Sequence, residues 1–497
     1  MAAEKNNNYF WKNDRWNGGW SEDSRIGTRG SARFILGGDF RSDSGLLRIA
    51  HKVTKISDSI VDQLAKWIEP HPTNGDTYAY AGDEIYKITS SDVFSLARTI
   101  SAGTPNGQGL AFFKITGTTY LFYRTGTTLG RFDLASTWDD SWQTGLVSVT
   151  DFGKLLQYKN LLLVANGRYV GTIDDVGTVS MQRLALPDGW KVRDMFRAGT
   201  WVCIIAIKGN VIADSNEGMA FFWDGTKETY NDFQPLDGNP HAGAYNNGTI
   251  VVIAGVQPQI YHSLGGKFEA QMGIPAIGEG SSAEVWPGAI DFFNKMIHFG
   301  ISDGDSTTVT RAVWNWGRKN ALLSDALNAE YVASPGTSSG TGLQIGAIRS
   351  VGTTLFIAWK AGSTYGIDKI DFTQYQSFVI WRSLAFDRES PYEKNAYKIM
   401  VELGKALEEG ESVSVKLSTD PYGDPQFQDS DTYETASLSF PVSSDQNPRL
   451  LELPLTYSEN DMRSRDLQLE VYAQGDGSST PEVKRAWVEL DEANESF

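Results

Sequence analysis

The sequence contains very little cysteine: Cys203 is the single example among 497 residues. One cysteine cannot form an intrachain disulfide, so folds stapled by disulfides are excluded. Cys203 lies inside the apolar run WVCIIAI. This setting indicates a small buried side chain, because reactive thiols lie in partly exposed, electropositive surroundings.

Long hydrophobic runs are also missing. No stretch approaches the roughly 18 apolar residues that identify a membrane-spanning helix, so we expect no membrane span. The first twenty residues, MAAEKNNNYFWKNDRWNGGW, lack the apolar core of a secretory signal. We therefore expect no signal peptide and a protein that is made in the cytoplasm.

Recognisable metal-binding and catalytic patterns are absent as well. The 5 histidines show no i, i+4 pairing of the kind found in zinc sites. The sequence has no P-loop. Two Asp-x-Asp pairs, Asp303 with Asp305 and Asp429 with Asp431, lack the further oxygen ligands of a calcium loop. We expect no metal site and no cofactor.

Paired carboxylates are the remaining route to an enzyme, because glycosidases need an acid and a nucleophile or base at one bond. Asp291 and Asp371 are candidates, but acids at strand ends commonly begin ordinary turns. The stretches 213–223 and 418–427 only approximate the repeated turn of sialidases. We predict that the chain is not an enzyme and has no catalytic residue.

Positive charge is scarce, since the net charge is −17. Most of the acidity is local: residues 388–497 contain 10 basic and 23 acidic side chains. No basic patch is present, and nucleic-acid binding depends on clustered lysine and arginine. Nucleic acid is therefore not expected as the main ligand.

Glycine, by contrast, is plentiful, with 50 residues placed between short apolar runs. The hairpin pattern KNLLLVANGRYVGTID (159–174) recurs with turns 39 to 57 residues apart. A repeat of about 40–50 residues with four short strands is typical of a β-propeller blade. The turns fall at Gly75, Gly117, Asn160, Gly199, Gly248, Lys295 and Gly352. We predict seven blades between about residues 59 and 387.

Each repeat has an internal order. Its second strand is a near-continuous apolar run, as expected where neighbouring blades cover both faces of a strand. In the last repeat, FVIWRSL is the predicted fourth strand, and residues 45–56 are a candidate to complete that blade and close the ring. The first strands collect small residues, interpreted as a steric requirement at the axis: Gly109, Ala111, Ala242, Gly243, Ala244, Gly288, Ala289, Gly346 and Ala347.

The pattern changes beyond Phe386. Several segments then alternate apolar and polar residues, which indicates strands with one solvated face. Five or more such strands over roughly 110 residues favour a β-sandwich. The expected fold is therefore all-β: an N-terminal aromatic arm (1–36), a seven-bladed β-propeller (37–387) and an acidic C-terminal β-sandwich (388–497).

Two groups of aromatic residues lie outside the repeat pattern. The arm contains Tyr9, Phe10, Trp11, Trp16 and Trp20. These residues either fold back on the chain's own propeller or dock on a neighbouring subunit, because aromatics are enriched in interface cores. The second group consists of loop-like tryptophans, which either stack on sugars or cover the gaps between blades: Trp138, Trp142, Trp314 and Trp316.

An enzyme-poor propeller with an acidic β-sandwich resembles the propeller-type structural proteins of tailed bacteriophages, such as the tail nozzle proteins of short-tailed phages. The stretches GGDFRSDSGLLRIAHKVTKIS (37–57) and STPEVKRAWVELD (479–491) are similar to the start and the closing strand of such proteins. The resemblance concerns the general sequence pattern over most of the chain and implies no particular functional residue.

The resemblance implies a virion protein of the tail, at the nozzle, the tip or an adaptor, which assembles as a symmetric ring and contacts the host surface. Its expected partners are copies of itself, other virion proteins and host cell-surface glycans. The alternative that we keep is a propeller that binds or cleaves host glycans, as sialidases do.

Overall fold

The computed structural model describes residues 9–492 outside a set of internal stretches. Those stretches are 22–29, 40–44, 61–62, 102–106, 148–152, 210–216, 237, 247, 264–265, 275–283, 303–311, 319–323, 336–342, 387–393, 419–432, 440–448, 456–462 and 465. Within this described part the chain forms strands and no helix. Contacts group it into unit 1 (1–53, 314–332 and 371–497) and unit 2 (54–313 and 333–370).

Seven of the sheets contain four strands each. The first consists of β5 (Ala65–Pro70), β6 (Thr77–Ala81), β7 (Glu84–Ile88) and β8 (Phe94–Thr99). The second consists of β9 (Gly109–Ile115), β10 (Thr118–Thr125), β11 (Thr128–Phe132) and β12 (Trp138–Gln143). The third consists of β13 (Leu155–Tyr158), β14 (Leu161–Asn166), β15 (Tyr169–Asp174) and β16 (Val179–Ala185). The fourth consists of β17 (Trp190–Ala198), β18 (Trp201–Lys208), β19 (Glu217–Trp223) and β20 (Asp232–Leu236).

The remaining three sheets continue this order. The fifth consists of β21 (Pro240–Asn246), β22 (Thr249–Ala254), β23 (Gln259–Ser263) and β24 (Glu269–Gly273). The sixth consists of β25 (Ile290–Phe293), β26 (Met296–Phe299), β27 (Ala312–Gly317) and β28 (Ala326–Val332). The seventh consists of β29 (Leu343–Val351), β30 (Thr354–Ala361), β31 (Thr364–Tyr375) and, from much earlier in the chain, β4 (His51–Ile60).

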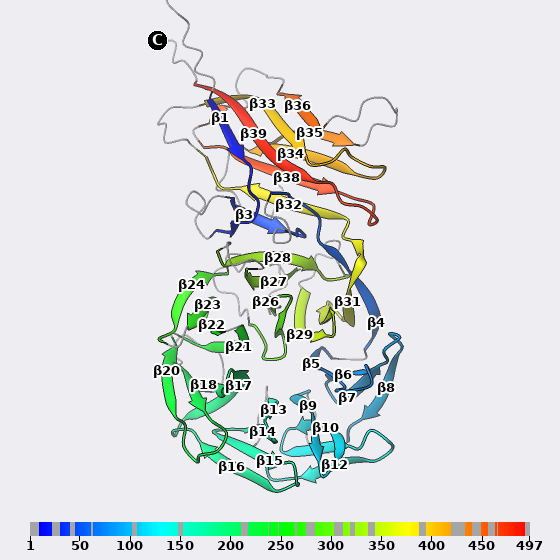
Figure 1. The fold of residues 1–497 in the computed structure, drawn as a ribbon, viewed down its shortest axis with the longest axis vertical. Coiled ribbons are helices and arrows are strands. Elements are labelled where there is room, and N and C mark those ends of the chain that lie inside the picture. The colour runs from blue at the N-terminus through cyan, green and yellow to red at the C-terminus, as the bar shows by residue number, and fades with distance from the viewer. Residues whose placement is uncertain are drawn as a thin grey trace, which may run out of the picture. The chain divides into compact units, whose positions relative to one another are not determined.

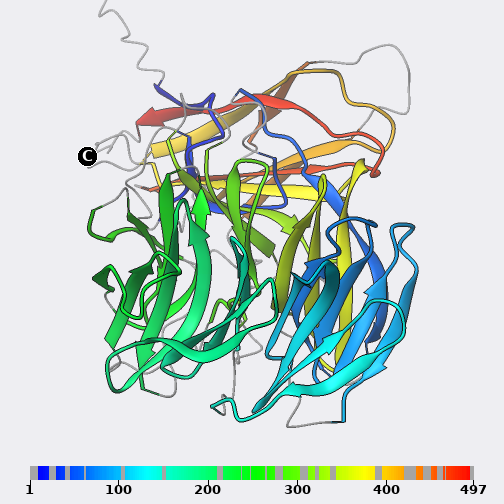
Figure 2. The same ribbon diagram turned by 60° about the horizontal axis from the view of Figure 1, so that its bottom comes forward.

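The first strands of the seven sheets form a closed ring. Neighbouring first strands contact one another in the order β5, β9, β13, β17, β21, β25 and β29, and β29 contacts β5 again. The ring is visible in Figure 1, and Figure 2 shows the blade strands running side by side. The protein is therefore a β-propeller, and the predicted count of seven four-stranded blades is confirmed.

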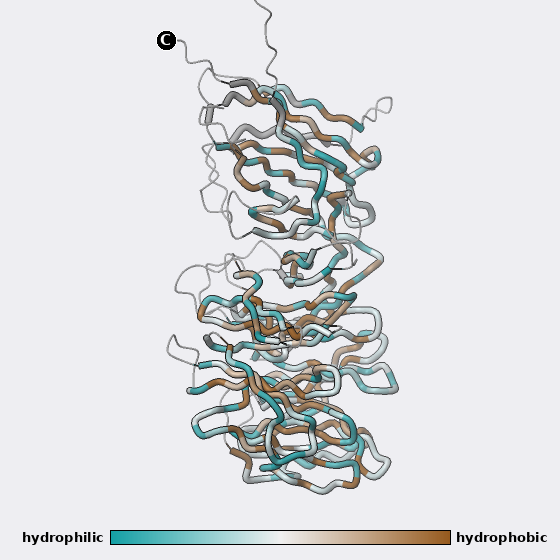
Figure 3. Tube along the Cα trace, turned by 60° about the vertical axis from the view of Figure 1, so that its left-hand side comes forward, coloured by the Kyte–Doolittle hydropathy of each residue, from teal (hydrophilic) through white to brown (hydrophobic). Residues whose placement is uncertain are grey.

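Apolar residues fill the spaces between adjacent blades. One cluster joins the third and fourth blades through residues such as Leu163 and Ile204, and another joins the first and seventh through Ala79 and Ala358. Figure 3 shows the matching pattern of short hydrophobic stretches between hydrophilic turns. The second strands are thus buried on both faces, as their near-continuous apolar runs predicted.

Small residues are required where the first strands converge. A Cβ atom at Gly288 would overlap the carbonyl oxygen of Lys66, and one at Gly346 would overlap the carbonyl oxygen of Ala65. At Gly243 a Cβ would meet the ring of Phe196. The steric interpretation of the small residues is therefore confirmed at these three glycines.

The last blade corrects one strand assignment and supports another. Residues 378–383, predicted as its fourth strand, form β32 (Phe378–Ser383), which pairs with β3 (Ser31–Leu36) and β38 (Gln468–Gln474). The fourth position is taken by β4. A strand from ahead of the first blade therefore completes the seventh, so this sheet gains its last strand without using the segment that follows β31.

Unit 1 contains two sheets whose strands come from both ends of the chain. The first has the order β1 (Tyr9–Asn13), β39 (Val483–Glu492), β33 (Lys394–Leu403) and β36 (Leu450–Pro454), with β37 (Arg463–Ser464) also paired to β33. The second has the order β2 (Gly19–Trp20), β3, β32, β38, β34 (Ser412–Ser418) and β35 (Tyr433–Ser439). The β-sandwich predicted for residues 388–497 stays a prediction.

The aromatic arm is part of unit 1. β1, with Tyr9, Phe10 and Trp11, pairs antiparallel with β39, and Trp11 stacks on Phe386. Trp16 and Trp20 are buried. Backbone pairing and ring packing within unit 1 therefore hold the described residues of the arm, and docking of its aromatic residues on a neighbouring subunit stays a prediction.

Candidate functional site

A cavity of about 630 Å³ lies where the first strands of the seven blades converge. Every one of these strands contributes to its wall, so the cavity lies on the propeller axis. Its volume falls within the range of small-molecule sites, which is roughly 300–1,000 Å³. The wall combines aromatic and aliphatic residues with a few charged groups, and these charged groups decide what the cavity can do.

Three of the charged residues come from three different blades. Glu69 lies on β5, Asp291 on β25 and Arg349 on β29. Arg349 Nη2 lies 2.8 Å from Glu69 Oε2, and its Nη1 lies 3.8 Å from Asp291 Oδ1. Asp291 Oδ2 also accepts a hydrogen bond from the Ser350 amide at 2.7 Å. One guanidinium therefore links the carboxylates of two other blades.

Burial and neighbouring charges shift the pKa values of Glu69 and Arg349 in opposite directions. Burial raises the pKa of Glu69, against the attraction of Arg349 and Lys154. Burial would lower the pKa of Arg349, but the charges of Glu69 and Asp291 raise it above its ordinary value. Arg349 lies deep in the propeller, yet 38% of its side chain is accessible. Arg349 is one of the residues that line the cavity.

Lys154 connects residues of several blades across the propeller axis. It precedes β13, and its Nζ donates to Pro287 O at 3.2 Å, in the segment leading to β25. The same nitrogen lies 3.3 Å from Asp194 Oδ1 on β17 and 4.7 Å from the ring centroid of Trp67 on β5. A single side chain thus bridges four blades across the axis.

Asp194 lies behind the cavity wall and has its acceptors filled. The amides of Met195 and Gly243 donate to it at 2.8 and 3.0 Å, and Lys154 supplies the opposite charge. Burial still raises the pKa of Asp194 despite these partners. Its role is to hold adjacent blades together.

His241 on β21 is a second buried polar link. Its Nδ1 accepts from the Val285 amide at 3.2 Å, so its Nε2 is the protonated nitrogen that donates to Gly255 O at 2.7 Å. Burial lowers the pKa of His241 to about 4. The ring is therefore neutral near pH 7, and both of its nitrogens are already engaged.

The structure places the carboxylates considered from sequence in different settings. Asp291 lines the cavity. Asp371 lies within β31 and accepts from the amide and hydroxyl of Thr373 on the same strand, so it does not begin a turn as expected. Two pairs, Asp303 with Asp305 and Asp429 with Asp431, lie outside the described residues. Within the described ranges no group of three or more potential ligands could hold a metal ion.

The four loop-like tryptophans differ in how far they are buried. Trp314 and Trp316 lie on β27 and are buried at 2% and 5% exposure, which corrects their prediction as surface contacts. Trp138 is half-buried on β12 and stacks on Phe132 with a centroid distance of 4.0 Å. Trp142 is half-buried on the same strand and packs on Phe122. These two outer-strand residues pack within their own blade.

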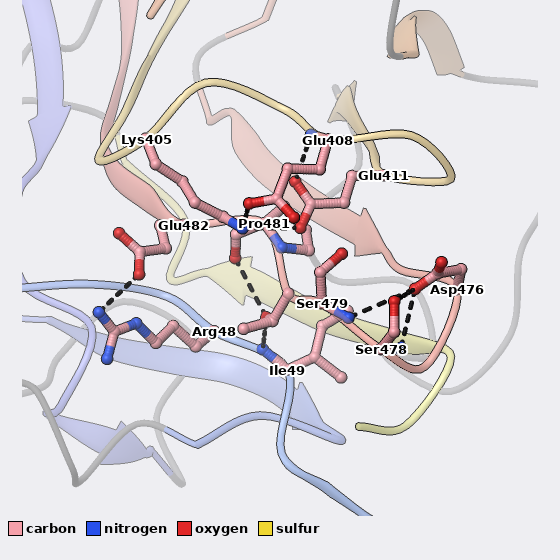
Figure 4. A network of polar contacts seen from close by, with 11 residues as sticks. Arg48, Ile49, Lys405, Glu408, Glu411, Asp476, Ser478, Ser479, Pro481 and Glu482 are labelled. Carbon is pink, nitrogen blue, oxygen red and sulfur yellow. Dashed lines mark hydrogen bonds and ion pairs between the residues drawn. The ribbon is translucent and has the colours of Figure 1, made fainter. Parts of the chain in front are cut away.

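Unit 1 has a polar network of a different kind (Figure 4). Arg48 donates to Glu482 at 2.6 Å, which ties the segment before β4 to the segment before β39. Lys405 lies 2.7 Å from Glu408 and 3.0 Å from the buried Glu411. These contacts connect loops of unit 1.

Sequence reasoning missed most of the cavity's charged residues. Glu69, Lys154 and Arg349 stand singly within or beside apolar first strands, about 85 to 195 residues apart. One signal was available: a charge inside a strand that otherwise faces a crowded axis is costly unless it is paired. Applied to each first strand in turn, that rule would have singled out these positions.

Comparisons with known proteins identify no family. No protein-family model matches the sequence, and no curated protein matches it. Among solved structures, the extracellular domain assigned to a hybrid two-component system of B. thetaiotaomicron is 9% identical, with a TM-score of 0.46. The match covers 72% of this chain, and the chain spans only 44% of that domain.

Two further solved structures are similar at the same level. The β-propeller domain of Cps50 (Swd1) from Myceliophteria thermophila has a TM-score of 0.43 at 10% identity, covering 64% of this chain and all of that domain. A chain of the mitotic checkpoint complex has a TM-score of 0.43 at 12% identity, covering 65% and 91%. Likenesses this distant say nothing about function.

In the described residues, no helix has the length and apolarity to cross a membrane.

Proposed function

We propose that the chain is a non-catalytic structural protein of a tailed-phage virion, in which the propeller serves as a stiff platform. The observation that carries the proposal is the closure of the ring. β4, from ahead of the first blade, completes the seventh, and β29 lies against β5. A closed blade ring leaves fewer free strand edges and resists opening.

The axial charges support a structural role in the same way. Lys154 links four blades, and Arg349 links the seventh blade to carboxylates of the first and sixth. Pairs of this kind fix the relative positions of the blades, and removing Lys154, the partner of the fully buried Asp194, is costly. The part of the proposal that concerns the tail, a symmetric ring of copies and contact with the host surface rests on the sequence resemblance alone.

The deciding experiment examines purified particles from the source of the sequence. The protein should be present in fixed copy number by quantitative mass spectrometry, and antibody labelling should place it on the tail. The adjacent genes should encode portal and tail proteins. Absence of the protein from infectious particles would exclude the virion role.

The absence of catalysis needs its own test. Purified protein should not hydrolyse sialosides, β-glycosides or peptides above the buffer rate. A raised pKa at Glu69, close to a second carboxylate at Asp291, is how glycosidases build an acid–base pair. Hydrolysis that disappears in both Glu69→Gln and Asp291→Asn would therefore replace the structural proposal with an enzymatic one.

A further inference from the structure

Arg349 has more hydrogen-bond donors than the surrounding chain satisfies. A guanidinium carries five N–H groups. The hydrogen bond to Glu69 uses Nη2. Nη1 has only Asp291 near it, at 3.8 Å, and this separation exceeds a hydrogen bond. Nε is buried with no hydrogen-bond partner. Most of the donor capacity of this cavity cation is therefore unused among the described residues.

The acids around the cavity are in the opposite condition. Asp291 accepts from the amides of Ser350 and Phe292 at 2.7 and 2.9 Å. Asp194 accepts from two amides and faces Lys154. The carboxylate oxygens already have donors, so the unmet demand in the cavity is for an acceptor at Arg349.

The walls define the rest of the ligand. Phe112 on β9, Phe292 on β25 and Ile348 on β29 are apolar members of the wall. The cavity, at about 630 Å³, is several times larger than a carboxylate group needs. Glu69 and Asp291 also lie beside Arg349, and their charges oppose a doubly charged oxyanion such as phosphate. A singly charged head on an apolar body fits these three conditions.

We propose that the axial cavity binds a small organic monocarboxylate. Its carboxylate accepts hydrogen bonds from the unused N–H groups of Arg349, and its apolar body lies against the walls formed by Phe112, Phe292 and Ile348. The proposal does not depend on a place in a virion, because it rests only on the geometry of the propeller axis.

The proposal also gives Glu69 a role. Its carboxylate faces Arg349, Lys154 and Asp291, and burial raises its pKa. A second carboxylate at Arg349 is accommodated most easily when Glu69 takes up a proton. Binding should therefore strengthen as the pH falls toward the raised pKa of Glu69, over the range in which the carboxylate of the ligand itself remains ionised.

The test is calorimetric titration of the full chain with sodium benzoate, with benzamide as the uncharged isostere and with inorganic phosphate. We expect benzoate to bind about tenfold or more tightly than either, since hydrogen bonds to charged groups contribute about 1.5–3 kcal/mol. Equal binding of benzamide, preference for phosphate, or no benzoate binding at about 10 mM would each overturn the proposal.

Matched variants locate the site. The double variant Arg349→Met with Glu69→Gln removes both members of the ion pair, while Asp291 keeps its two amide donors, and should weaken benzoate binding at least about tenfold. Gln157→Trp adds bulk at an exposed member of the cavity wall and should do the same. Gln157→Ala, and Arg183→Met on the outer strand β16, should bind as the parent does.

Thermal unfolding of every variant distinguishes a loss of folding from a loss of the binding site. If the double variant folds as the parent does and still binds benzoate unchanged, Arg349 is not the anchor and the proposal fails. If the double variant does not fold, the Gln157 pair decides: equal binding by Gln157→Trp and Gln157→Ala places the ligand outside the cavity.

Discussion

Six of the seven blades are built from four consecutive strands, whereas the sheets of unit 1 combine strands from opposite ends of the chain. In the second blade, β9 to β12 follow one another within 35 residues. In unit 1, β1 pairs with β39, and β3 pairs with β32. A blade is therefore specified by local contacts. The unit 1 sheets form only when distant segments meet, which costs loop-closure entropy before any contact compensates.

The polar networks of the two units differ in a related way. On the propeller axis, Lys154 and Arg349 link blades and border a cavity. In unit 1, Arg48 and Lys405 link loops, and Glu411 is buried beneath Lys405. The first network leaves donors unused, and the second joins parts of the chain that sequence order separates. Four experiments probe this difference, from the largest expected effect to the smallest.

The arm offers the largest effect. Trp16 is fully buried in unit 1, packs edge-on against Trp381 at 4.8 Å and donates from Nε1 to Lys484 O at 3.2 Å. Trp16→Ala should lower the free energy of unfolding by about 3–5 kcal/mol, because a buried tryptophan leaves a large cavity. Denaturant titration measures the loss. Trp201→Ala is the control, since Trp201 is 40% exposed. A loss below about 1 kcal/mol at Trp16 would mean that the arm is not part of the unit 1 core.

The axis of unit 2 should respond to acid through His241. Its pKa is about 4 in the fold, against roughly 6.5 when unfolded. Between these values the unfolded chain binds a proton that the native ring does not, so stability falls as pH drops from about 6.5 to about 4. The loss is about 3 kcal/mol.

The variant His241→Gln should remove this part of the pH dependence. Stability of parent and variant is compared by denaturant titration at pH 4 to 7. His71→Gln serves as the control, because His71 is only partly buried. If the stability of His241→Gln falls with decreasing pH as steeply as that of the parent, His241 is not held neutral by the fold.

The convergence of first strands gives the next effect. Gly288→Ala places a Cβ against the carbonyl of Lys66 in the first blade, and overpacking of this kind costs about 1–3 kcal/mol. Gly266→Ala is the matched control, because no atom lies within 4 Å of its new Cβ. Thermal unfolding followed by circular dichroism compares them. Equal midpoints would show that the blades can move apart at the axis.

The smallest effect compares the two networks directly through double-mutant cycles. In unit 1, Lys405→Met leaves buried Glu411 without its cation, and we expect a loss of about 2 kcal/mol that Glu411→Gln largely restores. On the axis, the Arg349 and Glu69 pair is 38% and 21% exposed, so its coupling should be about 1 kcal/mol or less. A larger coupling energy for Arg349 with Glu69 than for Lys405 with Glu411 would show that the axial network contributes more to stability than the unit 1 network does.

Local sequence patterns were sufficient to predict the seven blades of the propeller. The recurring turn around Gly75, Gly117 and Gly352 predicted seven blades because each hairpin is encoded within about 45 residues. All three glycines have positive φ, at 79°, 91° and 60°, which residues with side chains rarely adopt. Even the strand at 45–56 could be proposed from its apolar pattern, although its partner lies more than 300 residues away.

Tertiary structure alone decided where distant residues meet. Nothing local distinguishes Trp314 in WNWGRKN from a loop tryptophan; it is buried because Trp20, from the other end of the chain, packs on it at 5.0 Å. The cavity is the same case: Glu69, Asp291 and Arg349 are isolated charges in the sequence and neighbours on the axis. Hydrophobic periodicity specifies strands and turns, which are local, whereas a site depends on the ring closing, which brings the first and last blades together.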